Sequence, residues 1–106
     1  MAVQLPVGIS DRLLSLRLRR CTATLRELRD DLQITMAQLD VMNDDTADAE
    51  LRALVSETPL ADAHLRESKA HSTALGRHVT HLEERIAQLE QEQNDLLDRL
   101  HGNAAS

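Results

Sequence analysis

The fold is decided by the stretch from Thr58 to His101, which reads TPLADAHLRESKAHSTALGRHVTHLEERIAQLEQEQNDLLDRLH. Its apolar residues recur three and four positions apart, the seven-residue repeat that marks one face of a long amphipathic helix. Thr58 followed by Pro59 is a helix start signal, and a base followed by Gly102 is a stop signal. We therefore predict a helix over residues 59–101. Its inward face would hold Leu65, Leu75, Val79, Leu82, Ile86, Leu89, Leu96 and Leu100.

The residues upstream predict another helix, over about residues 10–55. Ser10 is a suitable N-cap, and Asp11 would place a carboxylate at the positive end of the helix dipole. The apolar repeat of this helix is interrupted once, by the polar residue Thr35. The other inward positions would be Leu14, Leu18, Cys21, Leu25, Leu28, Leu32, Leu39 and Met42.

The run from Asn43 to Ala49 is the weakest part of this upstream helix. Its Asn, Asp and Thr side chains compete for backbone hydrogen bonds and favour a turn. Either the helix continues through this run, or it breaks near Asp44 and a short third helix follows near residues 47–57. The remaining segments are expected to be a flexible arm at 1–9, a turn at 56–58 and a disordered tail at 102–106.

The composition favours one thin, elongated domain. The 106 residues include no Phe, Tyr or Trp, only three Gly and only two Pro, which leaves few turns and no aromatic core. We predict an all-α fold, an antiparallel two-helix coiled-coil hairpin that dimerises into a helical bundle. A tight turn at Glu57 would pair residues whose numbers sum to about 114, such as Leu25 with Leu89.

A register shifted by seven residues would gain the ion pairs Arg17–Glu92 and Asp31–His78, but it would place Leu14 opposite Gln93 and Asp11 opposite Leu96. A Leu left exposed costs roughly 1.5–3 kcal/mol, whereas an exposed ion pair contributes under about 1 kcal/mol. We therefore prefer the unshifted register, and there we interpret Gln93 as a polar layer that fixes the alignment. At the edges of this hairpin we expect Arg29 to meet Glu83 and Asp31 to meet Arg85.

Charge is distributed unevenly along the chain. The net charge is -6, so we expect no nucleic-acid partner. Residues 12–29 hold six Arg and one Glu, whereas residues 83–98 hold six acidic residues and one Arg. The two blocks would lie side by side in the hairpin. A further acidic patch near the turn consists of Asp40, Asp44, Asp45, Asp48 and Glu50.

No combination of residues indicates catalysis, so we expect neither an enzyme nor a small-molecule ligand. His64, His71 and His78 are seven residues apart, about 10 Å along a helix, too far to share one metal ion. We interpret them as a solvated stripe, with a pH-sensitive interface as the alternative. Cys21 on the inward face is interpreted as a buried small hydrophobe. We expect no cofactor and no metal, and a cytoplasmic protein without a signal peptide or membrane span.

Several apolar residues fall outside the inward faces, nearly all of them on the upstream helix. Exposed apolar surface of this kind usually marks an interface. We therefore predict a protein–protein interaction or assembly module, with a second copy as partner. The expected interface comprises Leu13, Leu16, Ile34, Val41, Leu51, Leu54, Val55 and Leu60.

Two other functions are also compatible with the sequence. A hairpin with carboxylates near its tip resembles in shape the factors that enter the secondary channel of RNA polymerase, which implies a regulator that inserts into a large enzyme. The basic segment at residues 11–20 fits instead a membrane-surface adaptor, which would bind anionic lipid. Alanine at Asp44, Asp45 and Asp48 would disable the regulator but leave self-association intact.

Overall fold

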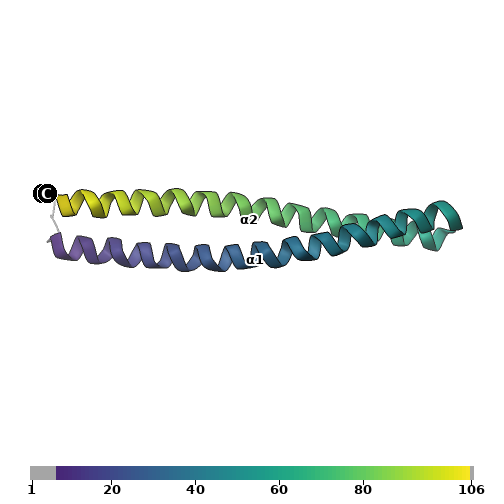
Figure 1. Ribbon diagram of the computed structural model, residues 1–106, viewed down its shortest axis with the longest axis horizontal. Helices are drawn as coiled ribbons and strands as arrows, with labels where there is room; N and C mark the ends of the chain where they lie inside the picture. The colour runs from purple at the N-terminus through teal and green to yellow at the C-terminus, as the bar shows by residue number, and fades with distance from the viewer. Residues whose placement is uncertain (1–6, 106) are drawn as a thin grey trace, which may run out of the picture. The chain divides into compact units, whose positions relative to one another are not determined.

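A computed structural model describes residues 7–105 of the chain, and these residues form two long helices in contact (Figure 1). Helix α1 spans Val7–Ser56 and helix α2 spans Pro59–Ala105. The chain reverses direction between them, so the first turns of α1 lie beside the last turns of α2. The prediction of an all-α helical hairpin is confirmed.

Helix α1 runs through Asn43–Ala49 without interruption. The alternative with a break near Asp44 and a third helix is therefore wrong. Thr46 explains part of the difference, because its hydroxyl donates to the Met42 carbonyl 2.9 Å away, within the helix. The same oxygen also contacts two hydroxyls of α2, partners that lie 22 and 26 residues further along the chain. These distant contacts are absent from the local pattern that favours a turn.

Both outer ends of the hairpin differ from the sequence prediction. Helix α1 begins at Val7, so Ser10 and Asp11 lie inside the helix and not at its cap. The predicted arm is helical from residue 7, and its residues 1–6 lie outside the described part. Helix α2 continues through Gly102, which has an ordinary negative φ, so the predicted stop and tail are wrong as far as residue 105. A glycine inside a helix costs only about 1 kcal/mol, which does not force an end.

The turn consists of Glu57 and Thr58. Glu57 has a φ of 49°, and its N–H donates to the Ala53 carbonyl at 3.2 Å, closing the last turn of α1. Thr58 caps α2, because its hydroxyl accepts a hydrogen bond from the Ala61 N–H at 3.2 Å. Pro59 occupies the first helical position, where no N–H is required. The predicted Thr-Pro start signal is confirmed.

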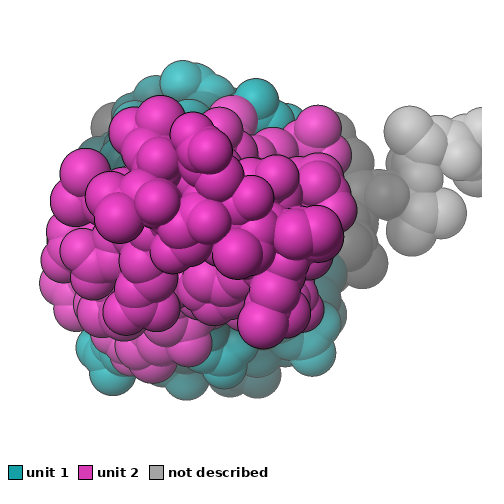
Figure 2. Space-filling model, turned by 90° about the vertical axis from the view of Figure 1, so that its right-hand side faces the viewer, with its two compact units in different colours: residues 1–29, 84–106 teal, residues 30–83 magenta. Residues whose placement is uncertain are grey.

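The chain divides into two compact units, coloured separately in Figure 2. Unit 1 contains residues 1–29 and 84–106, and unit 2 contains residues 30–83. In unit 1 the helices are joined by large aliphatic side chains, of which Leu25 and Leu96 are each only 1% exposed. The other buried residues of this core are Leu14, Cys21, Ile86 and Leu89.

Unit 2 has a core of smaller side chains. The buried residues here include Thr35, Ala49 and Ser68, with Leu82 as the large one. Because small side chains bury little apolar area, this unit gains less from the hydrophobic effect than unit 1. Hydrogen bonds between hydroxyl groups of the two helices contribute to holding this unit together.

The hydrogen bonds between inward-facing residues agree with the unshifted register, whereas two of the observed ion pairs, Arg17–Glu92 and Asp31–His78, are those expected for the shifted register. In unit 2 Thr46 contacts Ser68, and their numbers sum to 114, the predicted value. The predicted edge pairs are wrong, however, because Arg29 lies 3.9 Å from Glu90 and Asp31 lies 3.5 Å from His78.

The reason is that edge residues of antiparallel helices are offset from the core layers. Arg17–Glu92 and Asp31–His78 sum to 109, whereas Arg29–Glu90 and Glu50–Lys69 sum to 119. The basic part of α1 in unit 1 does pair with acidic residues of α2, as expected.

Candidate interaction surface

The apolar side chains that remain exposed lie mainly on α1. Nine of the eleven large apolar residues exposed in the described part belong to α1, and two belong to α2. All eight residues of the predicted interface are among them. Helix α1 thus has an apolar outer face that α2 lacks. The nine are Ile9, Leu13, Leu16, Ile34, Met36, Val41, Leu51, Leu54 and Val55.

In unit 1 the exposed apolar residues are surrounded by arginines. The spacings of four and three residues between Ile9, Leu13 and Leu16 place them on one side of α1. Arg19 and Arg20 are exposed next to them. The arginines of this segment that pair with α2 are others, Arg17 and Arg29. We name as the basic surface Ile9, Arg12, Leu13, Leu16, Arg19 and Arg20.

In unit 2 the exposed apolar residues of α1 are accompanied by carboxylates. Val41 is 68% exposed and Val55 is 85% exposed. An open groove of about 470 Å³ lies beside Val41, lined also by Met42 and Leu75. Three aspartates are exposed on this side of α1. We name as the acidic surface Asp40, Val41, Asp44, Asp48, Leu51 and Val55.

The predicted acidic patch is split between two directions. Asp45 faces α2, where its carboxylate lies 2.9 Å from the Ser68 hydroxyl. Glu50 also faces α2, with its carboxylate 3.7 Å from the Lys69 ammonium. Asp40, Asp44 and Asp48 are exposed and have no such contact with α2, whereas Glu50 is exposed but paired. The five carboxylates therefore do not face a partner as one group.

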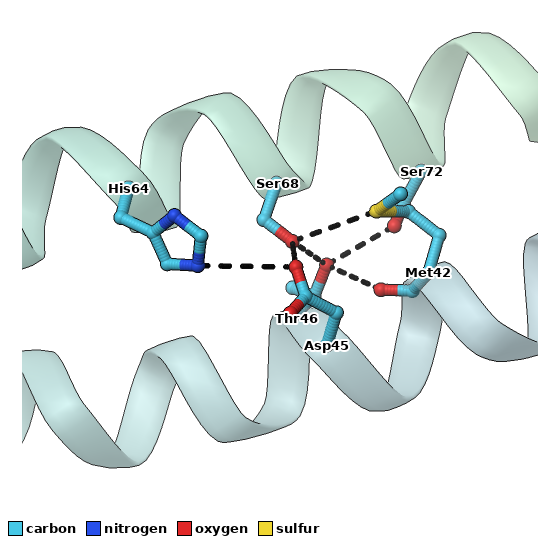
Figure 3. A network of polar contacts seen from close by, with 6 residues as sticks. All are labelled: Met42, Asp45, Thr46, His64, Ser68 and Ser72. Carbon is cyan, nitrogen blue, oxygen red and sulfur yellow. Dashed lines mark hydrogen bonds and ion pairs between the residues drawn. The ribbon is translucent and has the colours of Figure 1, made fainter.

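A network of polar contacts joins the two helices within unit 2 (Figure 3). The hydroxyl oxygen of Thr46 lies 2.8 Å from that of Ser68 and 3.1 Å from that of Ser72. Because Thr46 donates its one proton to the Met42 carbonyl, its oxygen accepts from Ser72, and the single proton of Ser68 is directed either to Thr46 or to the Asp45 carboxylate 2.9 Å away. The Asp45 carboxylate lies 3.9 Å from His64 Nε2. All buried side-chain polar atoms of the described residues have a hydrogen-bond partner. The sequence signal for this network was that Thr46, Ser68 and Ser72 all occupy inward positions in the unshifted register.

The network has the composition of a hydrolase triad but a different order. In a Ser-His-Asp triad the imidazole contacts the serine and takes its proton. Here the Asp45 carboxylate lies between Ser68 and His64. Ser68 is also only 4% exposed, which keeps its hydroxyl from any substrate. The arrangement is suited to joining two helices rather than to nucleophilic attack.

The other histidines and the cysteine show no arrangement for binding a metal. Within residues 7–105 no group of three or more His, Cys, Asp or Glu is placed to hold an ion. His78 pairs with Asp31, and His71 lines the groove beside Val41. Cys21 is buried, as predicted, and its thiol donates to the Leu89 carbonyl at 3.2 Å. Burial and the Glu92 carboxylate raise the pKa of this thiol, against the opposing effect of Arg85.

The sequence matches no known protein family, and neither curated proteins nor solved structures gave a match. Neither helix contains, in its described residues, a stretch long and apolar enough to cross a bilayer.

Proposed function

We propose that this protein is a non-enzymatic assembly module that binds protein through the outer face of α1. The observation that carries the proposal is the unequal distribution of exposed apolar residues between the two helices. A hairpin that acted alone would have no use for apolar side chains on the side of α1 that faces away from α2. Contiguous exposed apolar surface on a soluble protein commonly marks an interface.

The partner that we propose is a second copy, which would extend the hairpin into a helical bundle. In that bundle the seam between α1 and α2 of each copy would follow the seven-residue repeat of a coiled coil. Each Å² of apolar area removed from water contributes about 25 cal/mol. Val41, Leu54 and Val55 are each exposed by more than two thirds, so each offers a large gain on burial.

The regulator and the membrane adaptor receive less support from the contacts. A tip that inserts into a basic channel would present its carboxylates together, yet Asp45 and Glu50 are engaged with α2. Lipid binding through the basic segment would leave the apolar residues of unit 2, among them Val41 and Leu54, without a role.

Sedimentation equilibrium on the purified protein tests the proposal, with Val41→Asp as the variant. Val41 lies on the outer face of α1 and makes no part of the buried core. We expect a dimer for the wild type and at least tenfold weaker association for the variant. Ala74→Asp is the matched control, because it places the same charge on the exposed side of α2. A wild-type monomer, or equal association of both variants, would contradict the proposal.

A further inference from the structure

We propose that two copies associate antiparallel, with the basic surface of one copy against the acidic surface of the other. This inference rests on the proposed function and specifies its partner and orientation. Both surfaces lie on α1, one in unit 1 and the other in unit 2. Every copy carries both, so a two-fold dimer makes the same contact twice.

Charge complementarity determines the orientation. The basic surface holds Arg12, Arg19 and Arg20, all exposed and without an ion pair among the described contacts. The carboxylates of the acidic surface are likewise exposed and unpaired. A parallel arrangement would bring arginines against arginines and aspartates against aspartates. An antiparallel arrangement brings opposite charges together, which favours encounter and suppresses the wrong orientation.

The spacing of residues supports one particular alignment. In unit 1 the residues Ile9, Leu13, Leu16 and Arg20 follow each other at intervals of four, three and four. The acidic surface, read in the opposite direction, gives the same intervals. Antiparallel helices with equal intervals interlock along a common seam. The aligned pairs are Ile9–Val55, Leu13–Leu51, Leu16–Asp48 and Arg20–Asp44.

Neighbouring residues agree with this alignment. Arg19 falls opposite Asp40 at the edge of the seam, with the same offset from the core layers that Arg17–Glu92 shows within the hairpin. The small residue Ala23 falls opposite Val41. Among the pairs from Ile9–Val55 to Ala23–Val41, Leu16 opposite Asp48 is the one that sets an apolar side chain against a charge; Asp30 opposite Ile34 is another, at the centre of the dimer. A shift of seven residues in one direction places Leu13 against Asp44. A shift of seven residues in the other direction separates Arg20 from a carboxylate. We therefore prefer the unshifted alignment.

Charge reversal tests the orientation. In the variant Arg19→Glu/Arg20→Glu the basic surface becomes acidic, and in Asp40→Arg/Asp44→Arg the acidic surface becomes basic. We expect each variant alone to associate at least tenfold more weakly than the wild type, because both contacts of its dimer become repulsive. An equimolar mixture of the two variants is expected to recover wild-type association, since both contacts of the mixed dimer are again attractive.

The controls separate this inference from the proposed function. Arg66→Glu/Arg77→Glu makes the same change of charge at exposed positions of α2 and is expected to leave association within threefold of the wild type. Circular dichroism verifies that each variant is helical. If both reversal variants associate like the wild type, the antiparallel alignment is overturned and the assembly function stands. If the wild type is a monomer that binds vesicles containing phosphatidylserine, both are overturned and the basic surface serves a membrane.

Discussion

Thr46 and Ser68 face each other across the two helices of unit 2, with 2.8 Å between their hydroxyl oxygens. In unit 1 the equivalent inward positions hold large apolar side chains instead, such as Leu25 and Leu89. A polar layer costs apolar burial but restricts the helices to one alignment, since any other leaves buried hydroxyls unpaired. The Thr46 network therefore contributes to the register of the hairpin near its turn.

Replacing Thr46 with Val tests how much the cross-helix hydrogen bonds contribute. The change keeps the shape of the side chain but removes its contacts with Ser68 and Ser72. We expect the free energy of unfolding to fall by about 1 kcal/mol in urea denaturation.

Thr80→Val is the matched control for Thr46→Val. Thr80 also donates to the carbonyl four residues earlier, at Gly76, but it is exposed. Only the Thr46 variant loses contacts with the other helix. Equal losses of stability in the two variants would show that the cross-helix contacts contribute nothing.

Replacing Glu57 with Gly should stabilise the turn. Glu57 has a φ of 49°, a region in which a side chain costs roughly 1 kcal/mol and glycine costs little. We expect a gain of about 0.5–1 kcal/mol, offset in part by the greater freedom of glycine in the unfolded chain. Glu57→Ala keeps the unfavourable backbone conformation and is expected to give no gain. Thermal unfolding of the three proteins at one low concentration measures the difference.

Two adjacent leucines compare buried and exposed positions directly. Leu96 is 1% exposed and Leu97 is 36% exposed, both in α2 of unit 1. We expect Leu96→Ala to lower the free energy of unfolding by about 2–4 kcal/mol, because it removes packed methyl groups and leaves a cavity. Leu97→Ala should lower it by less than about 1 kcal/mol. Similar losses of stability for the two variants in urea denaturation would contradict the structure, in which Leu96 is buried and Leu97 is exposed.

The raised pKa of the Cys21 thiol predicts a pH dependence of stability. The folded protein keeps the thiol proton to higher pH than the unfolded chain, so the unfolded state is stabilised relative to the folded state as pH rises above the ordinary thiol value. The contribution is fully present at neutral pH and is lost as pH rises through the raised pKa. The chain has no Tyr and a single Lys, which leaves few other groups to titrate in this range.

The comparison with Cys21→Ala isolates this thiol. We expect the stability advantage of the wild type over Cys21→Ala to shrink between pH 7 and about pH 10. Urea denaturation of both proteins at each pH provides the four values. An advantage that stayed constant or grew with pH would contradict the raised pKa.

Features with a local cause were predictable from the sequence. Thr58 and Pro59 specify the start of α2 through one hydroxyl and one missing N–H, and both act within a single turn of helix. The inward faces were also predictable, since all of their residues are buried or half-buried in the structure. The exposure of Val41 and its neighbours on α1 follows from the same seven-residue repeat.

Features that depend on distant residues were not predictable. Helix α1 is continuous where Thr46 contacts residues of α2, and a local turn propensity does not include such contacts. The partner of Arg29 is Glu90, because edge residues of antiparallel helices are offset from the core layers. The division of the acidic patch has the same origin, since Asp45 is held by Ser68 while Asp44, its neighbour in sequence, is exposed.

Disulfide cross-linking between copies tests the central claim most directly. Two single-cysteine proteins, Leu13→Cys and Leu51→Cys, are made in a Cys21→Ala background and distinguished by mass. We predict that the oxidised mixture forms mainly the 13–51 cross-linked dimer, because the antiparallel contact of α1 with α1 brings these positions together. Ala74→Cys on α2 is the control and should cross-link to neither. A mixture that gave no dimer, or cross-linked equally well through position 74, would contradict assembly through the outer face of α1.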